Sequence, residues 1–230
     1  MAKHRLTPRI AKLDLARLAL GAGVLATALG AHAAVNADTH TTTAPAATVK
    51  TAAAAKPAAK PEEAKVKVSA AQVLDTARSQ VGVKENAQGG GTKFQQWYAS
   101  STRGGETAAR DGGARADYLN AAWCSMFVSW VGEHTGARAQ IGWDAYTVSH
   151  AKWFKDNGRF GSQAKPGSVV FFSWKGGKDL SDIQHVGFVV KDNGDGTIST
   201  IEGNTGNGKV EERKRPTSQV VGYGYPNYAA

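Results

Sequence analysis

The chain has 230 residues and a formal net charge of +9, from 28 Lys and Arg against 19 Asp and Glu. The charge is uneven, because residues 1–37 carry +4, residues 38–68 carry +2 and the remainder carries only +3. The C-terminal part is therefore too weakly basic to indicate a nucleic-acid partner, while a weak attraction to an anionic wall or membrane surface remains compatible with it.

The N-terminus has the pattern of an export signal. Five Lys and Arg in the first 17 residues precede an apolar stretch, 18–29, that is short and rich in Gly and Ala. Ala-His-Ala at 31–33 forms an A-x-A cleavage site, and 35–37 offers a second. We expect a signal peptide over 1–33 and a protein that is secreted or held in the cell wall, without stable membrane insertion after cleavage. The alternative is a retained single membrane anchor.

Residues 34–68 have the composition of a linker. They consist mostly of Thr, Ala, Pro and Lys and contain almost no large apolar side chain. Such a segment cannot bury enough surface to offset the entropy of ordering, so we predict a disordered tether. A single folded domain is expected over 69–230.

The first half of this domain has helical signals. Ser69 and Gln72 form a capping box ahead of apolar residues at helical spacing, and Gly82 is the expected stop. Residues 92–98 predict a short helix. Residues 99–119 are polar and Gly-rich without periodicity, which predicts a long loop that is functional or mobile and could form one wall of a cleft.

The only cysteine of the chain, Cys124, begins the next predicted helix, 123–134. Phe127, Val128 and Val131 follow it at i+3, i+4 and i+7, the spacing of one helix face. A thiol at a helix N-terminus lies at the positive end of the macrodipole, which favours the thiolate and a nucleophilic role. The alternative is a small buried hydrophobic residue. An exported chain with a single cysteine has no internal disulfide, which favours the reactive thiol.

After a further helix at 146–155, the apolar period changes to two. The strands predicted from this pattern are 169–172, 184–190, 197–202, 209–213 and 219–225. Helices followed by consecutive strands indicate an α+β fold, with N-terminal helices packed on an antiparallel sheet.

The strand pair 184–190 and 197–202 brings a histidine and an acid together. If Asn193-Gly194 forms a two-residue type I′ turn, His185 lies directly opposite Glu202, within reach of an imidazole–carboxylate hydrogen bond. A turn at Asp195-Gly196 would separate them. Asn204 follows on the same face and is a candidate to orient the ring or polarise a substrate.

A cysteine nucleophile needs a base, and the base needs an orienting group. His134 would lie about 15 Å from Cys124 along one helix, out of reach. His150 has no evident acid partner. His185 is therefore the candidate base, against the alternatives of a structural histidine at the end of a strand and a surface acid at Glu202.

Four stretches in this order resemble the CHAP domain, the cysteine, histidine-dependent amidohydrolase/peptidase: 123–127, 166–172, 184–189 and 201–204. The resemblance covers about residues 70–228 and implies a papain-like α+β fold. It also implies peptidoglycan as the substrate, cut as an N-acetylmuramoyl-L-alanine amidase or as an endopeptidase on stem peptides or crossbridges. The residues implied for catalysis are Cys124 as nucleophile, His185 as base, Glu202 as orienting acid and Asn204 as an accessory polar residue.

Two departures from the family pattern stand out. The turn at 166–168 is Pro-Gly-Ser instead of the usual Pro-Gly-Asp, and the acids before the cysteine, Asp111 and Asp117, stand among Gly, Ala and Arg. We therefore expect no calcium site, no other metal and no cofactor.

The resulting prediction is a monomeric, secreted cysteine hydrolase acting on cell-wall peptide. Trp123, Trp143 and Trp174 are candidates for lining the substrate groove, with core packing as the alternative for at least one of them. The rival functions are a non-catalytic wall-binding module and a papain-like protease or acyl transferase on protein substrates.

Overall fold

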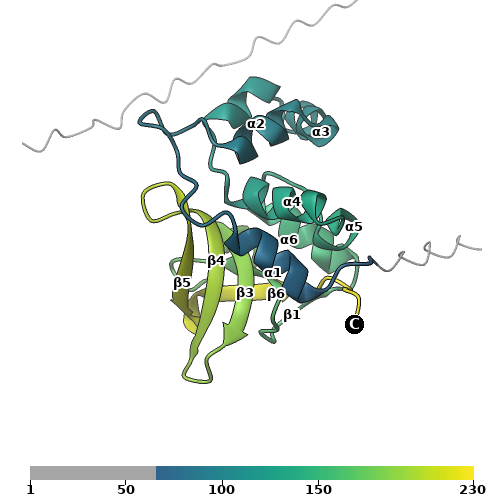
Figure 1. Cartoon of the computed structure of the whole chain (residues 1–230), viewed down its shortest axis with the longest axis vertical. Coiled ribbons are helices and arrows are strands. Elements are labelled where there is room, and N and C mark those ends of the chain that lie inside the picture. The colour runs from purple at the N-terminus through teal and green to yellow at the C-terminus, as the bar shows by residue number, and fades with distance from the viewer. Residues whose placement is uncertain (1–65) are drawn as a thin grey trace, which may run out of the picture. The chain divides into compact units, whose positions relative to one another are not determined.

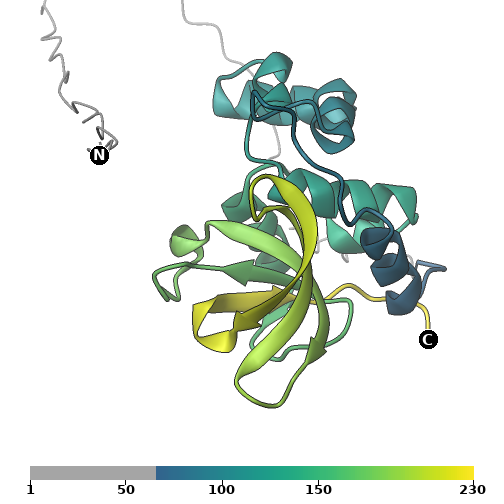
Figure 2. The same cartoon turned by 60° about the vertical axis from the view of Figure 1, so that its left-hand side comes forward.

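The computed structural model describes residues 66–230, so the predicted signal peptide and nearly all of the predicted linker lie outside the described residues. Figures 1 and 2 show this part of the chain as helices lying against a curved antiparallel sheet, which confirms the predicted α+β class. The helices are α1 Ala70–Arg78, α2 Lys93–Ser100, α3 Thr102–Asp111, α4 Cys124–His134, α5 Arg138–Ile141 and α6 Thr147–Asp156. The strands are β1 Phe160–Gly161, β2 Val169–Phe172, β3 His185–Asp192, β4 Thr197–Thr205, β5 Lys209–Pro216 and β6 Val220–Gly224.

Helix α1 begins as predicted and ends earlier than expected. Ser69 and Gln72 form the capping box, with Ser69 N–H donating to Gln72 Oε1 over 2.9 Å. The helix ends at Arg78, before the predicted stop at Gly82. Val66 and Val68 are buried, so core packing starts inside the segment expected to be a linker.

Residues 99–119 are not the long loop that we expected. They form α3 and a 3₁₀ helix at Arg115–Leu119. Ser101 caps the N-terminus of α3 by accepting the N–H of Gly104, and Gly112, in the left-handed region at φ 73°, ends the helix. Helix α3 buries small residues, among them Gly104, where a Cβ would lie 2.1 Å from the carbonyl oxygen of Tyr98. A search for large apolar residues cannot detect a helix that packs in this way.

Helix α4 is the central helix of the described domain. Its first nine residues, Cys124–Gly132, are all buried, and the predicted face of Phe127, Val128 and Val131 is inside. The helix packs on β3 and β4 (Figure 1). Gly203 of β4 permits this contact, because a Cβ there would lie 2.6 Å from Phe127 Cβ.

The sheet has the order β1-β6-β2-β3-β4-β5, and all paired strands are antiparallel. Val186 and Phe188 of β3 belong to the core shared with the helices, whereas Val189 belongs to a second cluster on the opposite face, with Phe172 of β2. The predicted alternation of β3 is therefore correct. Every predicted strand is present, and α6 begins and ends within one residue of its prediction.

The predicted register between β3 and β4 is wrong. Phe188 pairs with Ile201 and Val189 with Thr200, which is a shift of two residues from the register expected for an Asn193-Gly194 turn. The connection is the four-residue loop 193–196, closed by the Asn193 N–H donating to the Thr197 carbonyl, and a bulge follows Val189. His185 is therefore not directly opposite Glu202.

Candidate active site

Cys124 and His185 are the first residues of α4 and β3, and the fold brings them together. Cys124 lies close enough to His185 to raise the pKa of the imidazole, and each residue is 5% exposed. Helix α4 packs on β3 and β4 (Figure 1), and this packing brings the first residue of α4 close to the first residue of β3. The structure therefore contains the proximity that a cysteine–histidine pair requires.

His185 also binds Glu202, in spite of the register shift. The distance from His185 Nε2 to Glu202 Oε2 is 2.9 Å, and Glu202 is fully buried. The contact runs diagonally across the face, past Gly187. A Cβ on Gly187 would lie 2.7 Å from Glu202 Cγ, so the absent side chain leaves the space that the carboxylate occupies. Since Glu202 takes Nε2, Nδ1 is the ring nitrogen that this contact leaves available.

The carboxylate of Glu202 has two further partners that the sequence did not predict. Thr200 Oγ1 donates to Oε1 over 2.6 Å. Arg215 Nε lies 2.9 Å from Oε1, and Arg215 Nη2 lies 2.6 Å from Oε2. The predicted strand ended at residue 213, so Arg215 was outside it. The alternation of β5 is the signal that could have found it, because Arg213 and Arg215 share one face.

These contacts shift both pKa values in the directions expected for an ion pair. Burial opposes ionisation of Glu202, but hydrogen bonds from Arg215 and His185 outweigh it and lower the pKa to about 2. Burial likewise disfavours the imidazolium of His185, yet its interactions with Cys124 and Glu202 raise the pKa to about 9. The charged forms of both groups are therefore stable at neutral pH.

Asn204 lies in the left-handed region, with φ 53°, where the pairing of β4 with β5 changes register. It is half-buried, and within residues 66–230 its side chain makes no hydrogen bond. The contact with the imidazole that we considered is absent from this structure, and a role toward a substrate remains a prediction.

Of the three tryptophans expected to line a groove, only Trp174 lies beside the pair. Its ring is 5.1 Å from that of His185, and the residue is 41% exposed. Trp123 is fully buried, stacks on Phe94 and donates its indole N–H to Glu85, so its assignment to the groove is wrong and core packing explains it.

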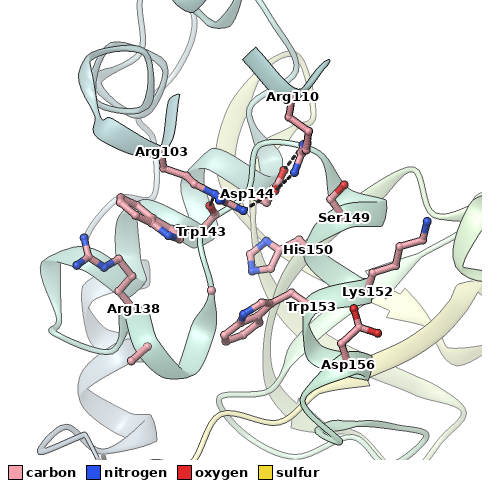
Figure 3. A pocket seen from close by; sticks show the side chains of 12 residues that line it. Arg103, Arg110, Arg138, Trp143, Asp144, Ser149, His150, Lys152, Trp153 and Asp156 are labelled. Atoms are coloured by element: carbon pink, nitrogen blue, oxygen red, sulfur yellow. Dashed lines mark hydrogen bonds and ion pairs between the residues drawn. The ribbon is translucent and has the colours of Figure 1, made fainter. Parts of the chain in front are cut away.

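Trp143 lines a different cavity of about 570 Å³, shown in Figure 3, whose lining includes neither Cys124 nor His185. The structure does not bring Trp143 beside the pair, and a role toward the substrate stays a prediction. Asp144 lies at the centre of this cavity, held by Arg103 at 3.2 Å and Arg110 at 2.7 Å (Figure 3). The residues that line the cavity are Arg103, Arg110, Arg138, Ala139, Gly142, Trp143, Asp144, Ser149, His150, Lys152, Trp153 and Asp156.

The other two histidines of the described domain have structural partners. His134 stacks on Trp130, with ring centroids 3.8 Å apart. His150 is fully buried between Ser125 Oγ at 2.8 Å and the Ile141 carbonyl at 2.7 Å, and burial lowers its pKa. Neither takes the place of His185 beside the cysteine.

The comparisons with known proteins agree with this geometry. The family model of the CHAP domain matches residues 116–204, a segment that contains Cys124, His185, Glu202 and Asn204. The chain therefore carries a CHAP domain, and its fold is consistent with the papain-like CHAP fold. This family generally comprises hydrolases, which act on peptidoglycan as amidases or peptidases. A comparison with curated proteins finds no match.

Two further features concern metals and membranes. Within residues 66–230 no three His, Cys, Asp or Glu side chains gather in a way that could hold a metal ion. None of the helices described for this stretch has the length and apolar character needed to span a bilayer.

Proposed function

We propose that the protein is a secreted cysteine hydrolase that cleaves amide bonds in peptidoglycan, with Cys124 as nucleophile, His185 as acid and base, and Glu202 as the group that orients the imidazole. The observation that carries this proposal is the placement of Cys124 next to His185, whose ring Nε2 lies 2.9 Å from the buried carboxylate of Glu202. The CHAP domain supports the substrate class.

The first half of the reaction forms an acyl-enzyme. His185 holds the proton of the Cys124 thiol, and the thiolate attacks the carbonyl carbon of the scissile amide. The tetrahedral intermediate collapses as the imidazolium donates its proton to the leaving nitrogen, which releases an amine and leaves a thioester on the sulfur.

The second half regenerates the enzyme. The now neutral His185 takes a proton from water as the oxygen attacks the thioester carbonyl. Collapse of this intermediate releases a carboxylic acid and returns the thiolate–imidazolium pair. Throughout, Glu202 accepts the other ring N–H and stabilises the imidazolium, without itself taking the proton.

The N-terminus of α4 supplies part of the oxyanion stabilisation in this scheme. The first N–H groups of a helix have no intrahelical acceptor, so the Cys124 N–H is a suitable donor to the developing oxyanion. Trp174 forms an exposed aromatic wall next to His185, where a peptide or a sugar of the substrate can pack.

The decisive experiment is mass spectrometry of muropeptides after digestion of purified peptidoglycan. We expect new amine and carboxyl ends with the wild type, none with Cys124→Ala or His185→Ala, and wild-type products with His134→Ala, a matched histidine on the exposed end of α4. Products from Cys124→Ala would contradict the mechanism.

Two further assays separate the rival functions. Slow iodoacetamide labelling of Cys124, like that of an ordinary thiol, would favour a non-catalytic wall-binding module. Turnover of casein instead of peptidoglycan would favour a papain-like protease.

A further inference from the structure

Arg215 contacts the acid of the candidate site more extensively than any other residue. Its Nε lies 2.9 Å and 3.2 Å from the two oxygens of Glu202, and its Nη2 lies 2.6 Å from one of them and 2.9 Å from Thr205 Oγ1. The guanidinium also lies 5.0 Å from the ring of Trp174. With its side chain only 15% exposed, Arg215 is packed into the site instead of lying on its surface.

A charge count shows what this contact does. The reactive form of the site contains a thiolate on Cys124, an imidazolium on His185 and a carboxylate on Glu202, which together carry one net negative charge in a buried place. Isolated buried charge is costly, and burial by itself favours the neutral form of a carboxyl group. The guanidinium of Arg215 brings the total to zero, and it cannot lose its own proton.

We propose that Arg215 is a positioning residue that keeps Glu202 ionised and fixes its carboxylate, so that the imidazole of His185 is held toward Cys124. This inference rests on the function proposed above. Arg215 touches neither the sulfur nor the imidazole in any contact that the structure gives, and it acts through Glu202.

The charged groups that face Glu202 come from two neighbouring strands. His185 faces it from β3, and Arg215 and Glu211 face it from β5, where Glu211 is its direct cross-strand partner. Cys124 of α4 lies one contact further, beyond the imidazole. Glu211 is itself paired with Lys209 and Arg213, so Arg215 is the guanidinium that compensates Glu202 directly.

The neighbouring Arg213 provides a matched control. It lies on the same face of β5, opposite Thr200, and its salt bridge is with Glu211 at 3.0 Å instead of Glu202. An Arg213→Met variant makes the same chemical change two residues away. Glu211 keeps its second ion pair, with Lys209 at 2.8 Å, so we expect Arg213→Met to leave the site intact.

The test is the pH dependence of peptidoglycan hydrolysis by Arg215→Met, Arg215→Lys and Arg213→Met, with the carboxyl carbon of Glu202 followed by NMR in the same proteins. In Arg215→Met we expect the titration of Glu202 and the acid limb of kcat/KM to move to higher pH by one unit or more, and kcat/KM at pH 7 to fall about 10- to 100-fold. In Arg215→Lys the positive charge remains, but the paired hydrogen bonds from the guanidinium to Glu202 are lost. The acid limb of kcat/KM therefore stays near that of the wild type, while kcat/KM itself falls. Arg213→Met behaves as the wild type.

The outcomes separate the inference from the proposed function. An unchanged Glu202 titration in Arg215→Met, or wild-type kcat/KM in Arg215→Lys, overturns the role of Arg215. If Arg215→Met does not fold, as judged by circular dichroism, the Lys variant decides alone. A shifted Glu202 titration in proteins that never hydrolyse peptidoglycan means that the proposed function fails while the electrostatic role of Arg215 stands.

Discussion

Replacing Gly187 with alanine tests whether the close approach of β3 and β4 holds the candidate site together. Gly187 lies between His185 and Val189 on one face of β3, and its φ is outside the left-handed region, so alanine meets no backbone penalty there. The effect is purely steric. The added Cβ would lie 2.7 Å from Glu202 Cγ and 2.9 Å from the carbonyl oxygen of Ile201.

Neither neighbour has room to move. The Ile201 oxygen belongs to the backbone of a central strand, and the Glu202 side chain is fixed by His185 and Arg215. Forcing a methyl group into such a contact costs about 1–3 kcal/mol of stability. The smaller entropy of the unfolded alanine chain offsets about 0.4–1 kcal/mol of this. A net loss of about 1–2 kcal/mol lowers the melting temperature of a domain of this size by about 2–8 °C.

Expressed as free energy, the expected loss of kcat/KM is larger than the expected loss of folding stability. Relieving the contact displaces the Glu202 carboxylate from the imidazole, and a misplacement near 1 Å costs about 100-fold in rate. The assay is kcat/KM on peptidoglycan at a temperature well below the transition, together with a thermal melt. Gly161→Ala in β1 is the control, because its methyl group meets only the ring of Tyr225. A Gly187→Ala protein with wild-type melting and activity would refute the close approach on which the site depends.

Three other variants test separate contacts. Because the pKa of Glu202 is lowered to about 2, its ionisation stabilises the fold fully above its ordinary pKa near 4.5, and this stability is lost as pH falls from about 4.5 to 2. Urea denaturation should therefore show a steeper acid destabilisation in the wild type than in Glu202→Gln, and equal slopes would contradict the ion pair. Trp174→Ala should lower kcat/KM about 2- to 10-fold, the value of one aromatic contact, with little change in the unfolding midpoint, and a large drop in that midpoint would mean that Trp174 is structural. Asp144→Asn removes the charge that holds Arg103 and Arg110 of α3, and should cost about 1–3 kcal/mol in urea denaturation without changing the Glu202 titration. Unchanged stability there would show that these ion pairs do not hold α3.

The helices and strands that bury large apolar residues could be predicted from the sequence, and those that bury small ones could not. Helix α4 and β2 carry continuous runs of buried apolar side chains, so their period is visible. Helix α3 packs through Gly104, Thr107 and Ala108, and its exposed face is charged, which gives the composition of a loop. Only the cap at Ser101 and the glycine at 112 marked its ends, and neither was recognised.

Only part of the candidate site could be predicted, again because only periodic elements are visible in the sequence. Cys124, His185 and Glu202 could be selected because each stands at a definite place in a periodic element. Trp123 and Trp143 were chosen by residue type alone, and residue type does not tell a core indole from a surface one. Arg215 was missed because the predicted strand ended at residue 213, although the alternation of β5 places Arg215 on the same face as Arg213.

The prediction of the His185–Glu202 pair held although the register behind it was wrong, and the parity of the error explains this. The pairing of β3 with β4 is shifted by two residues, an even number, so Glu202 stayed on the face of His185 and only moved one position along it. The residue opposite Glu202 is then Gly187, which has no side chain. The Glu202 carboxylate can therefore pass over it to reach His185. A shift by one residue would have turned Glu202 toward α4 and separated the pair. A strand prediction therefore gives the face on which a residue lies more reliably than its exact cross-strand partner. A glycine two residues from a candidate histidine, on the same face, indicates that a diagonal partner can reach the ring.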